Sequence, residues 1–290
     1  MAAPSRKRPP RPSAELLVAR SDAAADGAPS PDTIATGYAS IDRLLGGGVR
    51  RRDLVVLGGD IGSGKSALAL GIALRAAASG APVVFQTGEM SEDRVLERAL
   101  AIEGRATIDE LRGGHLDDLR RAEVGAAAVR LRDRPLIIQP LAGHTFTEVA
   151  EALRTVPRPA LLVVDYLQLV APPAAAGSAE DAAALAARGL KTLALEFDTA
   201  VLAVAQLPDH DPTRDDPRPT LDDFGGKGRI KQHADVVLAL YREEMYRPGG
   251  GMEGATELLV AKNRNGPTGF IDLYFYRRWL RFEDMLDPER

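Results

Sequence analysis

The sequence predicts an α/β fold built on a mostly parallel, twisted β-sheet that is flanked by helices. Three observations lead to this expectation. Short apolar segments alternate with helical segments along most of the 290 residues. Several of the short segments are apolar at every position, which is typical of parallel strands covered on both faces. The last three segments, 234–241, 257–263 and 270–276, follow one another with short connections, so we expect antiparallel strands at the C-terminal end of the sheet.

The individual elements follow in chain order. The segment 32–48, which ends in glycines, predicts a short amphipathic helix. Strands are expected at 54–58, 82–88, 136–140, 161–165, 200–206, 234–241, 257–263 and 270–276, and helices at 66–78, 91–104, near 145–155 and near 181–196. Two longer connections, 171–181 and 208–229, directly follow strands. Open α/β sheets carry their ligand sites on loops at the carboxyl ends of strands, so we expect functional residues there.

The composition changes near residue 32. Residues 1–31 are rich in Pro, Arg, Ser and Ala without periodicity, which predicts a disordered tail. Its basic residues leave open, as an alternative, an arm that contacts nucleic acid: Arg6, Lys7, Arg8 and Arg11. Residues 32–290 show no internal repeat and are expected to form a single domain.

The composition also excludes several kinds of site. The chain has no cysteine, which excludes disulfides, thiolate metal sites and cysteine nucleophiles. Its four histidines never have the spacing of zinc ligands. The net charge of −4 gives no general attraction to nucleic acid, so a basic surface would have to be local. No apolar run approaches the ~20 residues of a membrane span and no apolar signal segment opens the chain, so we expect a cytoplasmic protein without a membrane partner.

A phosphate-binding loop is the most specific local motif. It reads Gly59-Asp60-Ile61-Gly62-Ser63-Gly64-Lys65-Ser66 and matches G-x-x-x-x-G-K-[ST]. The motif follows an expected strand and opens an expected helix, so backbone N–H groups can converge on phosphate oxygens at a helix N-terminus. Lys65 would reach the β- and γ-phosphates of ATP, and the Ser66 hydroxyl would bind Mg²⁺. The alternative is a chance glycine-rich turn.

Three polar residues end apolar strands and are candidates for hydrolysis chemistry. Asp165 ends the strand 161–165, where a carboxylate can hold the metal ion through its water shell. Glu89 follows the strand that we expect beside it, so both carboxylates could converge on the γ-phosphate, with Glu89 orienting the attacking water. Gln206 could sense the γ-phosphate. The alternatives are an acid favoured near a helix N-terminus for Glu89 and a plain turn residue for Gln206.

A pair of cations ends the strand 257–263. Lys262 and Arg264 are two residues apart, so both side chains leave the same face of the strand. Two cations side by side repel each other unless an anion lies between or beyond them. The alternative is an ordinary solvated pair at the Gly-Pro turn that follows.

Several segments together resemble the C-terminal ATPase domain of DnaB-type replicative helicases, within the RecA-like superfamily of P-loop NTPases. The resemblance runs from about residue 36 to about residue 284. It is carried by TGYASIDRLLGGG, the phosphate loop, GEMSEDRVLERALA, VVDYLQLV, LAVAQL, IKQHADVVLALYREEMY and AKNRNGPTGFIDLYFYRRWLRFED. This combination is far more specific than a phosphate loop alone.

The resemblance implies roles for the polar residues at the strand ends. Glu89 matches the water-activating glutamate, Asp165 the metal-linked aspartate and Gln206 the γ-phosphate sensor. Lys262 and Arg264 match the pair that reaches the nucleotide of a neighbouring subunit. The anion beside these two cations would then be a γ-phosphate from another copy of the chain.

The resemblance also implies a nucleic-acid partner. The stretch 227–231 matches a loop that faces the central channel of the family's ring and holds single-stranded DNA by its backbone. The candidate contacts are Lys227, Gly228, Arg229 and Lys231. No aromatic residue interleaves them, so we expect contacts to phosphates that tolerate any base sequence. The family thus implies a homohexameric ring that hydrolyses ATP at subunit interfaces and unwinds DNA; a solvated surface loop is the alternative for this stretch.

The chain departs from the family pattern at several positions. Because only a short tail stands before the ATPase core, we expect the family's N-terminal helical collar domain to be absent and a primase partner to be doubtful. The channel loop reads Phe224-Gly225-Gly226-Lys227-Gly228 where the family has Leu-Arg-Glu-Ser-Gly. Gly88 stands where the family has Leu, as in RecA-like repair ATPases of the RadA kind. A DNA-dependent ATPase in repair or regulation, without unwinding activity, is therefore the alternative function, and an inactive nucleotide-binding scaffold a third hypothesis.

Overall fold

The computed structural model describes residues 30–141, 145–170, 179–208, 213–225, 229–249 and 251–285, together with residues 14, 15, 18, 21, 22 and 25. The chain divides into two units, Met1–Thr33 and Ile34–Arg290. The described residues before residue 30 are helical. The domain limits 1–31 and 32–290, and the disorder of the tail, stay predictions.

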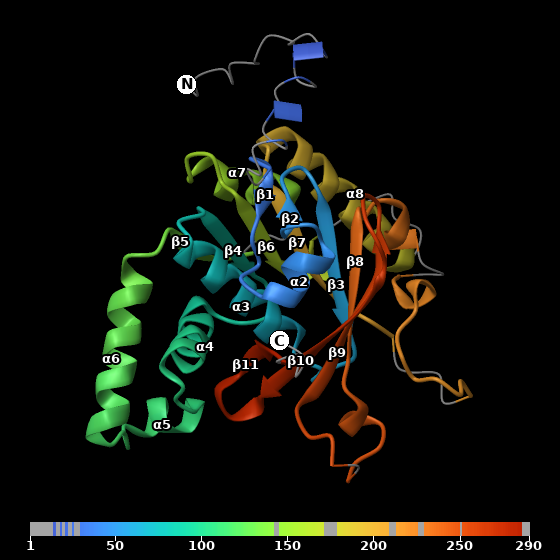
Figure 1. The fold of residues 1–290 in the computed structure, drawn as a ribbon. Coiled ribbons are helices and arrows are strands. Elements are labelled where there is room, and N and C mark those ends of the chain that lie inside the picture. The colour runs from blue at the N-terminus through green and yellow to red at the C-terminus, as the bar shows by residue number, and fades with distance from the viewer. Residues whose placement is uncertain are drawn as a thin grey trace. The chain divides into compact units, whose positions relative to one another are not determined.

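The elements follow one another as Figure 1 shows. The helices are α2 (Ala39–Leu44), α3 (Lys65–Ala78), α4 (Glu92–Gly104), α5 (Ile108–Gly113), α6 (Asp118–Arg132), α7 (Phe146–Arg154) and α8 (Ala179–Phe197). The strands are β1 (Thr33–Ile34), β2 (Val49–Arg50), β3 (Leu54–Gly59), β4 (Val83–Thr87), β5 (Leu136–Pro140), β6 (Leu161–Asp165), β7 (Ala200–Gln206), β8 (Val236–Tyr241), β9 (Ala255–Asn263), β10 (Gly269–Tyr276) and β11 (Arg281–Asp284). All the helices and strands expected from the sequence are present, with ends that differ by a few residues. In the described part of the chain, no helix is long and apolar enough to span a membrane.

In the described part of the chain, nine strands form one sheet in the order β11-β10-β9-β8-β3-β7-β6-β4-β5. The strands from β8 to β5 are parallel, and β9, β10 and β11 are antiparallel to their neighbours. This confirms the predicted α/β fold with a mostly parallel sheet and antiparallel C-terminal strands. One detail differs, because β8 was expected among the antiparallel strands and runs parallel to β3. Residues 207–235 separate β7 from β8, and a parallel pairing requires a long connection of this kind.

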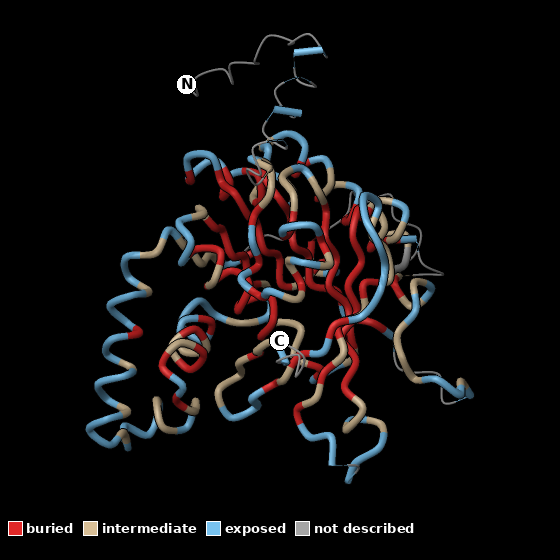
Figure 2. Tube along the Cα trace, viewed as in Figure 1, coloured by how far each residue is buried: buried red, intermediate tan, exposed pale blue. Residues whose placement is uncertain are grey.

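In the described part of the chain, two hydrophobic cores, one on each face of the sheet, explain why several of the parallel strands are almost entirely apolar. In β3, Val55 and Leu57 belong to the core that contains α3 and α4, whereas Leu54 and Val56 belong to the core that contains α7 and α8. Successive side chains of a strand point to opposite faces, so a strand covered on both faces has few polar positions. Figure 2 shows the result, with buried strands in the centre and exposed surfaces on the outer helices.

The region beside the sheet edge differs from the expectation. The helices α5 and α6 were not predicted. A side chain caps the N-terminus of each: the Thr107 hydroxyl accepts from the Glu110 N–H at 3.1 Å, and the Asp117 carboxylate accepts from the Arg120 N–H at 2.7 Å. In α6 only Ala127 is buried, so this helix has no apolar stripe that periodicity could reveal. The edge strand β5 is also only partly buried, although its sequence is apolar.

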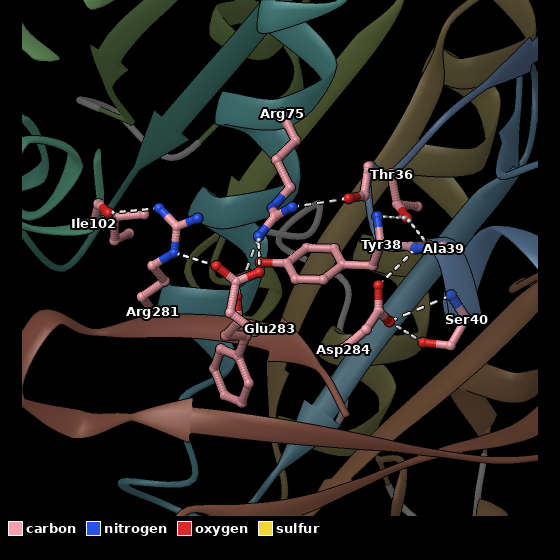
Figure 3. A network of polar contacts seen from close by, with 11 residues as sticks. Thr36, Tyr38, Ala39, Ser40, Arg75, Ile102, Arg281, Glu283 and Asp284 are labelled. Atoms are coloured by element: carbon pink, nitrogen blue, oxygen red, sulfur yellow. Dashed lines mark hydrogen bonds and ion pairs between the residues drawn. The ribbon is translucent and has the colours of Figure 1, made fainter. Parts of the chain in front are cut away.

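A polar network joins α3, which begins at the phosphate loop, to α2 and β11 (Figure 3). Arg75 in the last turn of α3 donates to the Gly37 carbonyl at 2.9 Å and pairs with the Glu283 carboxylate at 2.7 Å. Its guanidinium lies 4.2 Å from the centre of the Tyr38 ring. The Asp284 carboxylate accepts from the first N–H groups of α2, where the helix dipole favours a negative charge. The network thus holds β11 against both helices.

Two helical glycines provide a matched test of the packing on the α7–α8 face. A Cβ added at Gly189 in α8 would come within 2.3 Å of the Phe146 ring of α7, whereas nothing lies within 4 Å of one added at Gly125 in α6. We expect Gly189→Ala to lower the free energy of unfolding by about 1–3 kcal/mol, because overpacking outweighs the gain in helix propensity. We expect Gly125→Ala to raise it by about 0.5–1 kcal/mol. Urea denaturation measures both, and equal stabilities of the two variants would contradict the close packing of α7 on α8.

Candidate active site

A cleft of about 480 Å³ lies at the carboxyl ends of β3, β4, β6 and β7, where α3 begins. Parallel strands bring their carboxyl ends to the same edge of a sheet, which explains why polar strand ends gather here. The cleft is lined by most of the predicted catalytic and nucleotide-binding residues: Ile61, Gly62, Gly64, Lys65, Ser66, Glu89, Asp165 and Gln206. Lys262 and Arg264 do not line it.

The phosphate loop requires glycine where the motif has it. Gly64, directly before α3, has a φ of +102°, and an added Cβ would come within 2.9 Å of the Phe282 ring. A Cβ added at Gly59 would come within 2.7 Å of Ser63 Oγ, and Gly62 has a φ of +79°. Larger side chains are therefore excluded, which allows the loop backbone to approach a phosphate closely.

Lys65 is folded back over the loop. Its ammonium donates to the Asp60 carbonyl oxygen at 2.7 Å, and the Ser63 N–H donates to the same oxygen at 3.1 Å. Burial lowers the pKa of Lys65, while three nearby carboxylates oppose that shift. A phosphate in the cleft would favour the charged ammonium in the same way, so Lys65 is suited to bind one.

Ser66 and Asp165 bring a hydroxyl and a carboxylate together beside the loop. Ser66 Oγ donates to Asp165 Oδ1 at 3.1 Å, and Asp165 Oδ2 is buried without a hydrogen-bond partner. Asp165 is 1% exposed, and burial raises its pKa, with the Glu89 charge adding to the shift. No group of three or more His, Cys, Asp or Glu in the described residues could form a complete metal site. A hydroxyl and an open carboxylate oxygen fit Mg²⁺, which takes its remaining ligands from phosphates and water.

Two side-chain clamps hold the ends of β4 and β7 at the cleft. The Thr87 hydroxyl donates to the Met90 carbonyl at 2.8 Å and accepts from the Met90 N–H at 3.2 Å. This turn carries Glu89, which is exposed and lines the cleft. The Gln168 amide donates to the Gln206 carbonyl at 2.7 Å and accepts from the Gln206 N–H at 3.3 Å. The backbone geometry therefore presents both Glu89 and Gln206 to the cleft.

The cleft is also lined by three arginines that the sequence motifs did not indicate: Arg98, Arg242 and Arg277. Arg98 lies at helical spacing from the buried Val95 and Ile102, so the periodicity of α4 was a signal that Arg98 faces inward. Arg242 directly follows β8, is 3% exposed and donates to the Gly62 carbonyl at 3.0 Å. This contact joins residues far apart in the sequence, and no local pattern indicates it.

Lys262 and Arg264 lie toward the opposite end of the parallel strands, away from the cleft. Lys262 pairs with Val237 of β8, whereas Gly59 of the phosphate loop pairs with Leu240. Because β3 and β8 are parallel, the two cations lie level with the first half of β3 and not with its carboxyl end. The structure thus separates them from the cleft of their own chain.

Both cations contact the segment that precedes β8. The Lys262 ammonium donates to the Ala234 carbonyl at 2.6 Å and also to the Lys231 carbonyl. Arg264 Nη1 lies 3.2 Å from Asp235 Oδ1. An anion was expected beside these two cations, and Asp235 is one such anion within the same chain.

The predicted DNA loop is described only in part. Outside the described residues lie two of its members, Lys227 and Gly228. Arg229 pairs with Asp181 of α8, and Lys231 pairs with Asp222 at 2.6 Å. All four side chains are partly exposed, so these basic residues form ion pairs at the surface.

The order of motifs in this chain matches a known domain. The family described as "DnaB-like helicase C terminal domain" matches residues 33–284. The chain belongs to this family. The resemblance predicted from the sequence motifs is thereby confirmed.

Curated relatives of this DnaB-like domain are replicative helicases. The chain is 31% identical over 256 residues to the replicative DNA helicase DnaB of Leifsonia xyli subsp. xyli (strain CTCB07), covering 87% of this chain and 56% of that protein. It is 31% identical over 261 residues to the replicative DNA helicase DnaB of Pasteurella multocida (strain Pm70), covering 88% of this chain and 56% of that protein. The DnaB-like domain therefore spans a little more than half the length of these relatives.

Solved structures share the fold of this DnaB-like domain. A structure described as an ATPase domain matches with a TM-score of 0.87 and 24% identity, over 96% of this chain and 100% of that one. A DnaB-like replicative helicase, described with its interactions with primase, matches with a TM-score of 0.85 and 25% identity, over 97% of this chain and 68% of that one. The RecA-like fold is confirmed, and the matched family is that of helicases, not of RadA-like ATPases. The comparisons give no support to the expectation that a primase partner is doubtful.

The buried Asp165 carboxyl has a testable consequence. Because folding raises its pKa, the ionised carboxylate costs stability at pH values above the folded pKa, and this cost disappears at acid pH, where the carboxyl is protonated. We expect Asp165→Asn without ligand to melt at or above the wild-type temperature at pH 7.5. ATP with Mg²⁺ should raise the melting temperature less for Asp165→Asn than for wild type, because the variant lacks the carboxylate expected to hold Mg²⁺.

Differential scanning fluorimetry measures both effects. The exposed carboxylate of Asp133 provides the control, and Asp133→Asn should respond to ATP and Mg²⁺ as wild type does. An unliganded Asp165→Asn that melts well below wild type would contradict the cost assigned to the buried charge.

Proposed function

We propose that this chain is the ATP-hydrolysing motor of a ring-forming DNA helicase that moves on single-stranded DNA. The observation that carries the proposal is the separation of the catalytic groups between the two edges of the sheet. The phosphate loop and the carboxylates line the cleft at one edge, and Lys262 and Arg264 lie at the other. A second copy of the chain can present these cations to the cleft of the first, as in a closed ring with head-to-tail interfaces. Membership of the DnaB-like helicase family supports this assembly.

Within the cleft, the positions of the residues support a division of roles. The phosphate loop would bind ATP through its backbone N–H groups, with Lys65 on the β- and γ-phosphates. Ser66 and Asp165 would hold Mg²⁺, which supplies neutralisation of the phosphate charge, and the unpartnered Asp165 Oδ2 supports this assignment. Glu89 would orient the attacking water and accept its proton. Gln206, at the end of β7, would contact the γ-phosphate.

The strand register supports action of the two cations on a neighbouring copy. Lys262 lies beside Val237, three positions before Leu240, and its ammonium contacts the Ala234 carbonyl, still further from the loop. At ~3.3 Å per residue, about 10 Å of strand separates Lys262 from the level of the phosphate loop. Arg264 lies beyond Lys262 along the chain. An arginine supplied by another subunit typically contributes ~10³–10⁵ in rate by stabilising transition-state charge, and six copies in a ring would place one at every cleft.

The DNA partner is proposed to be held through its backbone. The contacts would come from Lys227, Gly228, Arg229 and Lys231. Exposed ion pairs such as those of Arg229 and Lys231 contribute little stability, so DNA phosphates can replace the carboxylates. Binding of this kind weakens steeply with salt and is insensitive to base sequence. The cytoplasmic location predicted from the sequence is part of the same proposal.

Strand displacement on a forked DNA duplex tests the proposed function. We expect wild type to separate the strands with ATP and Mg²⁺. Glu89→Gln should bind ATP within about threefold of wild type but lose about 10²–10⁴-fold in kcat, because only the group that activates water is removed. Lys65→Ala should lose both binding and turnover, because a charge-assisted phosphate contact is lost. Glu92→Gln provides the matched control, since Glu92 is an exposed acid in the first turn of α4.

Two results would change the assignment. ATP hydrolysis that single-stranded DNA stimulates, without strand displacement, would favour the DNA-dependent ATPase without unwinding activity. Turnover of Glu89→Gln at the wild-type rate would show that another group activates the water.

A mixing experiment tests whether Arg264 acts across an interface. We expect Arg264→Ala to bind ATP almost normally and to hydrolyse it at least about 10³-fold more slowly. Mixing it with Lys65→Ala should restore part of the activity, because an intact Arg264 then faces an intact phosphate loop at some junctions. The exposed Arg132 provides a control, and Arg132→Ala should hydrolyse ATP normally. Mixed rings that form, as native mass shows, and yet stay inactive would exclude action across the interface.

A further inference from the structure

Asp235 is a buried carboxylate at the amino-terminal end of the parallel strands, opposite the nucleotide cleft. It is 2% exposed and directly precedes β8. Its Oδ2 accepts from the Leu54 N–H at 2.8 Å and from the Lys191 ammonium at 2.5 Å. Its Oδ1 lies 3.2 Å from Arg264 Nη1. One oxygen of Asp235 is therefore held by the core, and the other is paired with Arg264.

The backbone ties Arg264 to the same point. The Arg264 N–H donates to the Asp235 carbonyl at 2.9 Å, and the Asp235 N–H donates to the Leu54 carbonyl at 2.8 Å. The backbone N–H and the guanidinium of Arg264 both contact Asp235, and Asp235 is itself bonded to Leu54, the first residue of β3. The Arg264 side chain is still 50% exposed. A guanidinium has five N–H donors, so a single carboxylate oxygen leaves most of them available to an anion outside the subunit.

Asp235 belongs to a cluster of ion pairs. The Asp53 carboxylate lies 3.7 Å from the Lys191 ammonium, so two carboxylates meet two cations, Lys191 and Arg264. Burial raises the pKa of Asp53 and repulsion from Asp235 adds to this shift, whereas the charges of Lys191, Arg50 and Arg264 lower it. A buried charge that loses one partner is strongly destabilised, so the cluster has a strong preference for keeping Arg264 in place.

The same segment of chain also holds Lys262. Its ammonium donates to the carbonyls of Lys231 and Ala234, the latter directly before Asp235. Burial lowers the pKa of Lys262, and the positive charge of Arg264 lowers it further. The negative charge of Asp235 opposes this shift. Asp235 is therefore the anion that offsets the repulsion between Lys262 and Arg264 at the end of β9.

We propose that Asp235 is a positioning residue that holds the Arg264 guanidinium at the subunit surface, oriented toward the nucleotide of a neighbouring copy. The inference rests on the proposed function, in which Arg264 acts on that nucleotide. Asp235 touches neither ATP nor DNA and acts only through Arg264. Because it follows the segment 229–232, where DNA contacts are proposed, a shift of that segment would move the anchor of Arg264.

Asp235→Asn and Lys191→Met form a matched pair that separates positioning from structure. Both remove one partner from the same buried ion pair, so both should lower the melting temperature. Asp235→Asn removes the negative charge that faces Arg264, whereas Lys191→Met keeps that charge. We expect Asp235→Asn to lower kcat about tenfold or more, because small misplacements of a catalytic group cost up to ~10²-fold, with nucleotide Kd within about twofold of wild type. Lys191→Met should keep kcat within about threefold of wild type.

A double-mutant cycle provides the second readout. In the Arg264→Ala background, Asp235→Asn should cause no further loss of kcat, because its effect passes through the absent side chain. A further loss there, or equal kcat losses in Asp235→Asn and Lys191→Met, would overturn the proposal. Normal hydrolysis by Arg264→Ala alone would instead contradict the proposed function.

A second variant covers the case in which Asp235→Asn does not fold. Asp235→Ser keeps an oxygen that can accept from the Leu54 N–H, and it should show the same loss of kcat at unchanged nucleotide Kd. Failure of both variants to fold, shown by circular dichroism, would assign Asp235 a structural role only and overturn the proposal.

Discussion

The parallel alignment of β3, β7, β6 and β4 is the constraint on which the candidate site depends. Because these strands run in the same direction, their carboxyl ends meet at one edge of the sheet. Burial on both faces fixes the register, since a slip of one residue would turn every side chain to the other face. Glu89 and Asp165 carry like charges that repel each other, so their proximity is imposed by the sheet and not by mutual attraction.

Two buried carboxylates lie at opposite edges of this sheet, and their surroundings differ. Asp165 has an oxygen without a hydrogen-bond partner, and burial raises its pKa. Asp235 has both oxygens engaged, by Leu54, Lys191 and Arg264. A buried carboxylate with an open oxygen can accept a cation from outside the chain, whereas a saturated one orients cations that the chain already supplies. This difference in hydrogen bonding is why Asp165 is proposed to hold a metal ion and Asp235 to hold an arginine.

The C-terminal strands shape the phosphate loop although they lie outside its motif. The Phe282 ring of β11 occupies the space where a Cβ at Gly64 would lie, and it stacks on Phe275 with ring centres 4.3 Å apart. Arg75 ties α3 to the same strand through Glu283. The requirement for glycine before α3 thus has two causes: the positive φ of the turn and a ring contributed from more than 200 residues away.

Local patterns in the sequence determined the elements and their polar ends. Apolar runs located the strands at 136–140, 161–165 and 200–206 with the bounds that the structure has, and glycine spacing located the phosphate loop. These signals act over a few residues, so a sequence displays them directly. The tertiary structure alone decided the long-range partners, such as Arg242 on the phosphate loop and the Asp235–Arg264 pair. Such partners are set by how whole elements pack, because a charged residue at a strand end carries no local mark of the charge that it will meet.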